Sequence, residues 1–147
     1  MPSNPHADPQ ARIAPPSESE AEAICAGLRR FNSEVIGAHD FKPLWLAAHA
    51  ADGRLIGGAV GYVGLGWLHL EALWVEQTAR GRGLGAALLA RIEASAIESG
   101  AHAAHLDTFD WQAEGFYLKQ GYREFGRLED FPRGRQRLFL QKRLSPE

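Results

Sequence analysis

The stretch Leu73–Ala86, LWVEQTARGRGLGA, decides the fold of this chain. It joins an apolar strand-like segment, a loop in which Arg and Gly alternate, and the start of a helix. Gly83 and Gly85 have no Cβ, so backbone amides can approach an anion closely. The free N–H groups and positive dipole end of the helix would face that anion, and Arg80 and Arg82 add forked donors. The stretch therefore predicts a diphosphate site.

The glycine spacing narrows the kind of phosphate loop. It is not the G-x-G-x-x-G of dinucleotide-binding folds, and no Lys-Ser/Thr pair follows as in a P-loop. The run Arg80–Gly85, RGRGLG, resembles the Arg/Gln-x-x-Gly-x-Gly/Ala signature of the GCN5-related N-acetyltransferases (GNAT). Downstream, Ala113–Tyr122, AEGFYLKQGY, resembles that family's A-x-x-F-Y-x-K-x-G-F/Y segment. The two signatures stand in the family's order, and the resemblance covers residues 43 to 144 best.

Size and composition bound the class of protein. The chain has 147 residues, 45% hydrophobic and 23% charged, with a net charge of −2, which is ordinary for one soluble domain. This charge gives no drive toward nucleic acid or an anionic membrane. The single Cys25 suits a reducing compartment, and no apolar run approaches the about 20 residues of a membrane span. We therefore predict a cytoplasmic protein that binds neither nucleic acid nor membrane.

The N-terminal part carries the weaker signals. Residues 1–10 are predicted to form a flexible leader, and residues 11–147 a single domain. Ala11–Ala14 is predicted to be a short edge strand. Ser17 and Glu20 have capping-box spacing, so a helix is predicted to begin there and to end near residue 32. Residues 33–42 fit a loop or an irregular helix.

From residue 43 onward strands and helices alternate. Strands are predicted over Leu44–Ala51, Arg54–Val63, Trp67–Val75, Ala103–Thr108, Tyr122–Leu128 and Arg137–Leu144, and helices over Arg82–Ser99 and Trp111–Gln120. Asp52-Gly53 is a strong hairpin turn. A strand, a crossover helix and a further strand over residues 67–108 predict a parallel pair.

The resemblance implies the fold of the acyl-CoA N-acyltransferases. That fold is α/β, with a mixed sheet flanked by helices and splayed between its fourth and fifth strands. Here those strands would be Trp67–Val75 and Ala103–Thr108, and acetyl-CoA would lie in the splay.

The resemblance also implies which residues hold acetyl-CoA. Backbone groups of the strand end would bond the pantetheine arm as an added strand would, and one N–H group would face the thioester oxygen. The predicted set is Leu73, Trp74, Val75, Arg80, Gly81, Arg82, Gly83, Leu84, Gly85, Ala86, Ala113, Phe116 and Tyr117. The side chains of Leu73 and Val75 can pack in the core at the same time, because side chains and backbone do different jobs.

Tyr117 is the predicted general acid. The family places a tyrosine at this position to protonate the leaving thiolate. A free tyrosine has a pKa of about 10, close to that of an alkyl thiol, so the transfer is plausible. The alternative is a tyrosine that only shields the cofactor.

Glu71 is the predicted general base. It stands two residues before Leu73, so regular alternation would put both on one face of the strand. A partly buried carboxyl group has a raised pKa, which suits a base near neutrality. His69 on the same strand is an alternative, as are His105, Asp107 and bulk water.

Several other residues have either a structural or a functional interpretation. Asp110 stands where many family members have Asn, and we expect it to cap the helix at Trp111. The four tryptophans and Tyr62 can line an amine pocket or fill the core. The arginines at 133, 135 and 137 can attract an acidic group or form a solvated loop. No three ligand-type residues have metal-site spacing, so no metal is predicted.

These residues together predict an acetyl-CoA-dependent N-acetyltransferase. The acceptor would be a small-molecule or peptide amine that attacks directly in a ternary complex. Cys25 falls on the first predicted helix, away from the loop, so no covalent acetyl-enzyme is expected. A different acyl-CoA donor and a catalytically silent CoA-binding domain remain alternatives, and a homodimer is possible.

Overall fold

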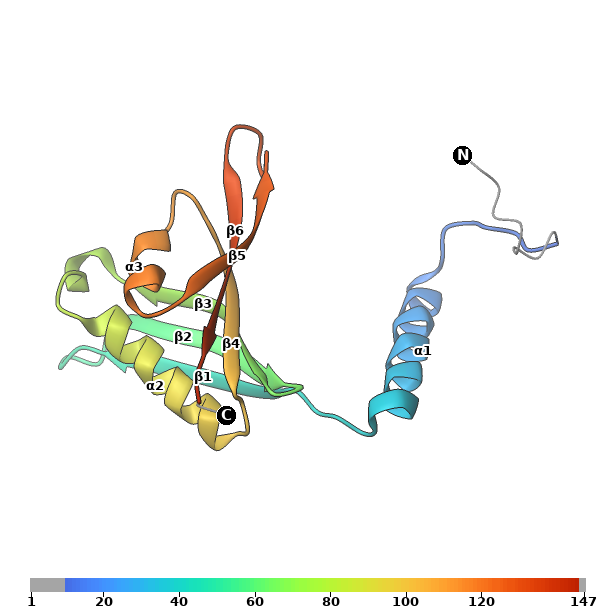
Figure 1. Ribbon diagram of the computed structural model, residues 1–147, viewed down its shortest axis with the longest axis horizontal. Coiled ribbons are helices and arrows are strands. Elements are labelled where there is room, and N and C mark those ends of the chain that lie inside the picture. Colours follow the sequence, from blue (N-terminus) through green and yellow to red (C-terminus); the bar gives the residue numbers. More distant parts are fainter. Residues whose placement is uncertain (1–9, 146–147) are drawn as a thin grey trace. The chain divides into compact units, whose positions relative to one another are not determined.

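The computed structural model describes residues 10–145, and the chain divides into two units. The N-terminal unit, Met1–His39, contains helix α1, Glu18–Ile36. The sheet unit, Asp40–Glu147, contains every other helix and strand that the structure describes (Figure 1). Of the predicted leader, all but Gln10 lies outside the described residues. None of the described helices has both the length and the apolarity to span a membrane.

Helix α1 begins as its capping box predicts. The Glu20 N–H group donates to the Ser17 hydroxyl at 3.2 Å, and the Ser17 N–H group donates to the Glu20 carboxylate at 2.8 Å. The helix runs past the predicted end to Ile36, where Gly37 adopts a φ of 80° and closes it. The edge strand predicted over residues 11–14 is wrong, because these residues pair with none of the described strands.

The sheet unit is built on six strands in the order β1-β2-β3-β4-β6-β5. Their bounds are Lys42–His49 for β1, Leu55–Gly64 for β2, Trp67–Val75 for β3, Ala103–Phe109 for β4, Arg123–Glu129 for β5 and Gln136–Arg143 for β6. Strands β3 and β4 are parallel, and the other neighbours are antiparallel. This mixed sheet confirms the predicted fold class.

The sheet splays where the prediction places the opening. Strands β3 and β4 pair over three positions, and the last is His69 opposite His105. On its other edge, β4 pairs with β6 along its whole length, from Ala103 to Phe109. The C-terminal half of β3 therefore loses its neighbour on one side, which leaves backbone groups there open to a ligand.

A β-bulge in β3 corrects the predicted position of Glu71. Leu70 and Ala72 face consecutive residues of β2, so Glu71 is the extra residue between them. Leu70 packs in the core before the bulge and Leu73 packs against it afterwards, although regular alternation cannot put residues three apart on one face. The prediction that Glu71 shares a face with Leu73 is wrong, because the bulge resets the alternation.

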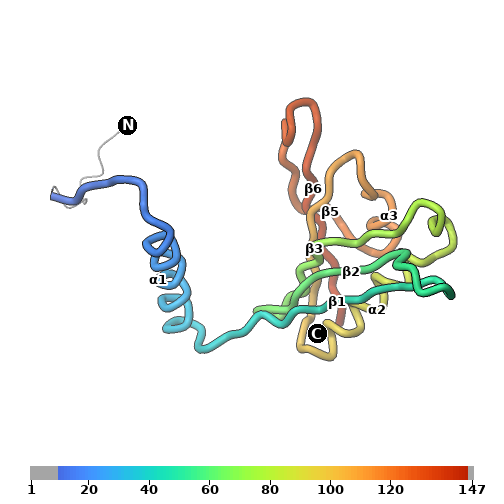
Figure 2. Tube along the Cα trace, turned by 180° about the vertical axis from the view of Figure 1, so that it is seen from behind, coloured from blue at the N-terminus to red at the C-terminus, as the bar shows by residue number. Residues whose placement is uncertain are grey.

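Helix α2, Leu84–Glu98, covers one face of the sheet. It lies in front of the strands in Figure 1 and behind them in Figure 2, where the view is reversed. Leu89, Ile92 and Ala96 of α2 join buried residues of the strands, such as Leu68 and Leu106, in one core cluster. Burial of this apolar stripe, at about 25 cal/mol per Å², holds α2 on the sheet.

Helix α3 is shorter than predicted and spans Glu114–Lys119. The Gln112 side chain accepts hydrogen bonds from the Phe109 N–H group at 2.9 Å and from the Thr108 hydroxyl at 3.0 Å. These bonds hold residues 109–112 in a turn, so the helix begins only after Ala113.

A buried carboxylate ties α2 to strand β6 and to the residue before β5. Glu93 is 8% exposed. It accepts hydrogen bonds from the Tyr122 hydroxyl at 3.2 Å and from the Lys142 ammonium group at 3.0 Å. Tyr122 closes the second family signature, so this contact gives that aromatic position a structural reason.

Glu93→Ala is expected to lower the free energy of unfolding by about 3 kcal/mol, because it leaves the Lys142 charge without its partner. Urea denaturation measures this loss. The double variant Glu93→Leu/Lys142→Met should recover most of it, since no charge is then left unpaired. Glu98→Ala, an exposed change on the same helix, is the control. An equal loss in Glu98→Ala and Glu93→Ala would contradict the role of the buried pair.

Candidate active site

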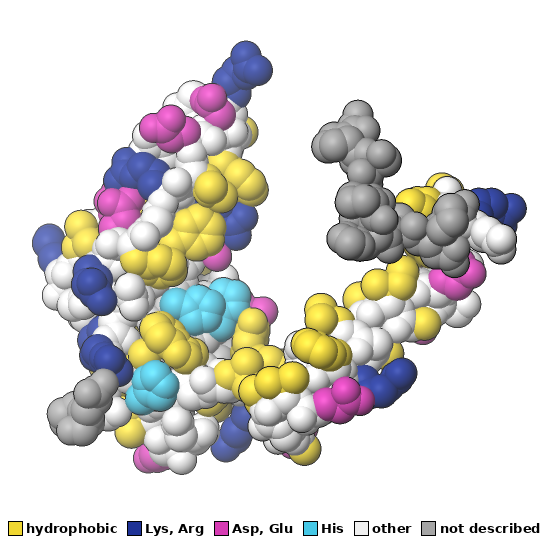
Figure 3. All heavy atoms as spheres, turned by 45° about the vertical axis from the view of Figure 1, so that its right-hand side comes forward, with side chains coloured by type: hydrophobic (Ala, Val, Ile, Leu, Met, Phe, Trp, Pro, Cys, Tyr) yellow, Lys and Arg dark blue, Asp and Glu magenta, His cyan; other side chains and the backbone are white. Residues whose placement is uncertain are grey.

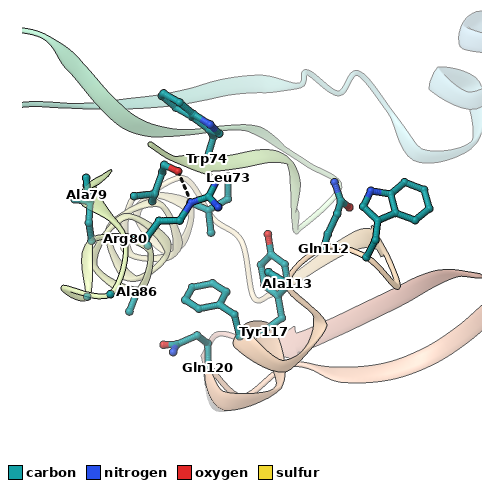
Figure 4. Close-up of a pocket in the computed structure, with 16 residues that line it drawn as sticks. Leu73, Trp74, Ala79, Arg80, Ala86, Gln112, Ala113, Tyr117 and Gln120 are labelled. Atoms are coloured by element: carbon teal, nitrogen blue, oxygen red, sulfur yellow. Dashed lines mark hydrogen bonds between the residues drawn. The ribbon is translucent and has the colours of Figure 1, made fainter. Parts of the chain in front are cut away.

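A cavity of about 720 Å³ opens between the end of β3, the loop after it, and the starts of α2 and α3 (Figure 4). Its size suits a cofactor-sized ligand. The lining residues are Leu73, Trp74, Val75, Ala79, Arg80, Gly81, Gly83, Leu84, Gly85, Ala86, Trp111, Gln112, Ala113, Phe116, Tyr117 and Gln120. Every residue of the predicted cofactor set is among them except Arg82, which is exposed.

The wall formed by β3 presents open backbone groups. The Glu76 N–H group donates to the Ile56 carbonyl at 2.8 Å, toward β2. Backbone groups along a strand point alternately to its two sides, so those of Leu73 and Val75 point away from β2 and into the splay. The Val75 carbonyl accepts from Arg80 Nε at 2.9 Å. Arg80 thus holds the loop against β3, and the Leu73 groups stay available to an extended ligand.

The start of α2 presents a second set of donors. Gly83 is the N-cap residue, with a φ of 81° and no side-chain cap. The first bond within the helix runs from the Ala87 N–H group to the Gly83 carbonyl at 3.0 Å. The N–H groups of Leu84, Gly85 and Ala86 therefore lack an acceptor in the helix, and all three residues line the cavity. The first turn contains no acidic residue, so its positive end is free for an anion.

Tyr117 rises from α3 with its hydroxyl directed across the cavity toward Leu73 (Figure 4). The residue is 8% exposed, and its ring contacts Phe116 and Tyr122 edge-on. Burial raises the pKa of Tyr117 to about 12. The hydroxyl therefore stays protonated throughout the neutral range and can donate a proton, although the driving force for donation is smaller than that of a free tyrosine.

The comparisons with known proteins decide the family. The sequence profile of the Acetyltransferase (GNAT) family matches residues 9–122. The chain belongs to this family. The match confirms the resemblance carried by Arg80–Gly85 and Ala113–Tyr122.

Similar proteins cover most of this GNAT chain. Blasticidin-S acetyltransferase of Streptomyces morookaense is 46% identical over 93 residues, which are 63% of this chain and 68% of that protein. Acetyltransferase Atu2258 of Agrobacterium fabrum is 32% identical over 128 residues, covering 86% of this chain and 93% of that protein. The crystal structure of an acetyltransferase from Bacillus cereus matches with a TM-score of 0.85 and 33% identity, over 90% and 97% of the two chains. Acetyltransferase activity is therefore the general activity of this group.

The residues predicted as bases in this GNAT domain lie outside the cavity lining. Glu71 is exposed at the bulge. His69 and His105 lie together at the vertex of the splay. Asp107 forms an ion pair with Arg137, whose Nη2 and Nε atoms lie 2.6 and 2.8 Å from one carboxylate oxygen. Asp107 is therefore an anchor for β6 rather than an available base.

Asp110 does not cap a helix in this GNAT domain, which corrects the sequence-based expectation. Its carboxylate accepts from the Gln136 N–H group at 3.1 Å and pairs with Arg135 at 3.5 Å. Ala113 is the N-cap residue of α3. The turn held by Gln112 swings Asp110 toward β6, a contact between distant parts of the chain that no local pattern signals.

Four lining residues were not predicted: Ala79, Trp111, Gln112 and Gln120. Trp111 and Gln112 enter the lining because they form the turn before α3 rather than its first turn. Trp74 and Trp111 both line the cavity, so part of the tryptophan content serves the site. The described residues contain no group of three His, Cys, Asp or Glu side chains placed to hold a metal ion.

Proposed function

We propose that this GNAT protein transfers the acetyl group of acetyl-CoA to an amine of a small molecule or peptide, by direct attack in a ternary complex. The proposal rests on one observation, which is that three features line the same cavity. These are the free amides at the start of α2, the open edge of β3 and the inward hydroxyl of Tyr117.

The cavity fits the parts of acetyl-CoA in order. The diphosphate would bind the N–H groups of Leu84, Gly85 and Ala86, where the helix dipole favours negative charge. The pantetheine arm would lie along the open edge of β3 as an added strand. Its thioester would then reach the region between Leu73 and Tyr117. An N–H group of β3 would stabilise the oxyanion that forms during attack.

The reaction needs three proton transfers: from the amine to a base, from Tyr117 to the thiolate, and from the nitrogen of the tetrahedral intermediate back to Tyr117. The amine nitrogen forms a bond to the thioester carbonyl carbon, and the carbon–sulfur bond breaks. Tyr117 donates its proton to the departing thiolate, and CoA leaves as a thiol. The attacking amine is mostly protonated at neutral pH, so a base must first take a proton from it.

The relatives support a small amine as acceptor. The most identical of the relatives described above is named for acetylation of blasticidin S. We carry over the class, a small amine-bearing molecule, rather than that compound. Trp74 and Trp111 on the cavity lining would suit a cationic amine, because an aromatic face attracts a cation.

Binding of acetyl-CoA is the first test. Calorimetric titration should give a dissociation constant on the order of micromolar for acetyl-CoA, a similar affinity for CoA, and no binding of ATP. Release of thiol is then followed with a panel of amines that includes blasticidin S and a lysine peptide. Failure to bind acetyl-CoA would overturn the proposal.

The acyl donor and catalysis are tested in the same assay. Propionyl-CoA and succinyl-CoA replace acetyl-CoA, and faster turnover with either would change the donor but keep the reaction class. Tight binding of acetyl-CoA with no thiol release, for any amine between pH 6 and about 9.5, would favour the catalytically silent binder. At about pH 9.5 an α-amino group is neutral and about a tenth of a lysine amine is, so enough free amine is present for activity to appear without a base.

A further inference from the structure

Two histidine side chains stack at the vertex of the splay. The rings of His69 and His105 lie 4.5 Å apart between centroids, with an angle of 7° between their planes. They stand opposite each other at the last paired position of β3 and β4. Figure 3 shows histidine side chains next to each other on the surface of the sheet unit, bordered by hydrophobic side chains.

The pair lies on the face of the sheet that α2 does not cover. The neighbouring residues Leu68, Leu70 and Leu106 point into the core cluster shared with α2. Successive side chains of a strand point to opposite faces, so His69 and His105 point away from α2. An amine that enters the splay from this face would meet the pair.

Tyr62 of β2 fixes the orientation of one ring. Its hydroxyl lies 2.9 Å from His69 Nδ1, and its ring packs edge-on against His69. When Nδ1–H donates to the Tyr62 hydroxyl, Nε2 carries no proton and can accept one. A base held by an orienting hydrogen bond is the arrangement that proton abstraction requires.

The surroundings allow the two rings to hold one proton but disfavour two. Burial first, and then the charge of His69, lower the pKa of His105, and Asp107 opposes this shift. The titratable groups recorded around the pair are Tyr62 on β2, which contacts His69, Asp107 on β4, which acts on His105, and His102, which packs against the same Trp67 ring as His105. Arg137 neutralises Asp107 through their ion pair. Two positive rings in stacking contact would repel each other, which disfavours a doubly charged pair.

We propose that His69, oriented by Tyr62 and stacked on His105, is the general base for the acetyl transfer. This inference rests on the proposed function. The proton first leaves the attacking ammonium nitrogen and reaches His69 Nε2, and the freed lone pair then forms the nitrogen–carbon bond. His69 and Leu73 stand opposite Tyr62 and Ala59 of β2, which are three positions apart, so they lie about 10 Å apart along the sheet at about 3.3 Å per residue. The proton therefore passes through water in the splay. Tyr62 and His105 are positioning residues.

Glu71 is the competing base, and two observations favour the histidine. Glu71 is exposed at the bulge, outside the stacked and hydrogen-bonded group of side chains at the vertex of the splay. Histidine is the side chain that most often serves as a general base in enzymes. His69 is also held in place by two contacts.

The kinetic test measures kcat/KM between pH 5.5 and 9.5 with the best amine of the panel. His69→Gln is expected to lower kcat/KM at pH 7 by about 50-fold, and the loss should shrink as the amine becomes neutral at high pH. Tyr62→Phe should lower it by about tenfold through loss of one hydrogen bond to the charged ring. His105→Gln should lower kcat/KM at pH 7 less than His69→Gln does, because His105 positions the His69 ring by stacking and does not itself accept the proton.

His49→Gln, an exposed histidine on β1, is the control and should keep the wild-type profile. Acetyl-CoA affinity should be the same in every variant. An acid limb that survives in His69→Gln but disappears in Glu71→Gln would overturn the proposal and assign the base to Glu71. An unchanged limb in both variants would overturn it in favour of bulk water.

NMR titration of the histidine side chains tests the pair without an acceptor. His69→Gln should raise the midpoint of His105, because the charge of its neighbour is removed. An unchanged midpoint would show that the rings do not interact, and would overturn the proposal. If the wild-type chain binds acetyl-CoA but acetylates no amine at any pH, the proposed function fails, whatever the titration shows. Activity with no effect of His69→Gln defeats the base assignment alone.

Discussion

Tyr117→Phe is expected to lower kcat by about 1,000-fold, within the range for loss of a general acid, while the dissociation constant of acetyl-CoA changes less than about twofold. The hydroxyl is the part of the side chain that points into the cavity, and the ring keeps its contacts with Phe116 and Tyr122 in the variant. Steady-state kinetics and calorimetry with acetyl-CoA measure the two quantities.

Tyr122→Phe is the matched control. It also removes one hydroxyl from a buried tyrosine, and its ring packs edge-on against Tyr117. That hydroxyl donates to Glu93 in the core, so its loss should reduce stability by about 1 kcal/mol and leave kcat near the wild-type value. Equal losses of kcat in the two variants would contradict the acid role and favour a tyrosine that only shapes the cavity.

Gly83→Val is expected to raise the dissociation constant of acetyl-CoA by on the order of 100-fold, equivalent to about 2.8 kcal/mol. Gly83 has a φ of 81°, and a Cβ there would stand in open space at the cavity. The valine would occupy the position where phosphate oxygens approach the amides of α2, and a β-branched residue is strained at positive φ. Calorimetric titration measures the change.

Gly100→Val separates the backbone strain from the block of the site. Gly100 follows the other end of α2 with a φ of 93°, and a Cβ there also meets no neighbouring atom. Both variants should lose about 1–2 kcal/mol of stability from the left-handed backbone. Only Gly83→Val should weaken cofactor binding. If Gly100→Val weakens it as much, the effect of Gly83→Val comes from the fold and not from the phosphate site.

Local chemistry explains what the sequence predicted well. Ser17 and Glu20 cap α1 through contacts between residues three apart. The apolar run Trp67–Val75 forms β3 with the predicted bounds. The glycines of residues 80–86 begin α2 without a side-chain cap. In each case the interacting groups are neighbours in the chain, so their spacing already contains the geometry.

Contacts between distant segments explain what the sequence missed. The extra residue at Glu71 depends on how β3 pairs with β2, and it reversed the predicted face of that side chain. The Asp110 carboxylate, just after β4, accepts a hydrogen bond from the Gln136 N–H group at the start of β6 instead of capping α3. The stacking of His69 on His105 exists because the crossover through α2 puts two strands side by side in one register.

The sequence by itself determined the family, the mixed α/β fold and most of the cavity lining, because strand periodicity, glycine conformation and helix termini act over a few residues. The tertiary structure decided at which residue pair β3 and β4 separate, which face each β3 side chain takes and which carboxylates are already paired. Those features depend on strand register and on one bulge, and register is set by how the whole sheet packs against α2. The choice of base between Glu71 and His69 therefore belongs to the tertiary structure.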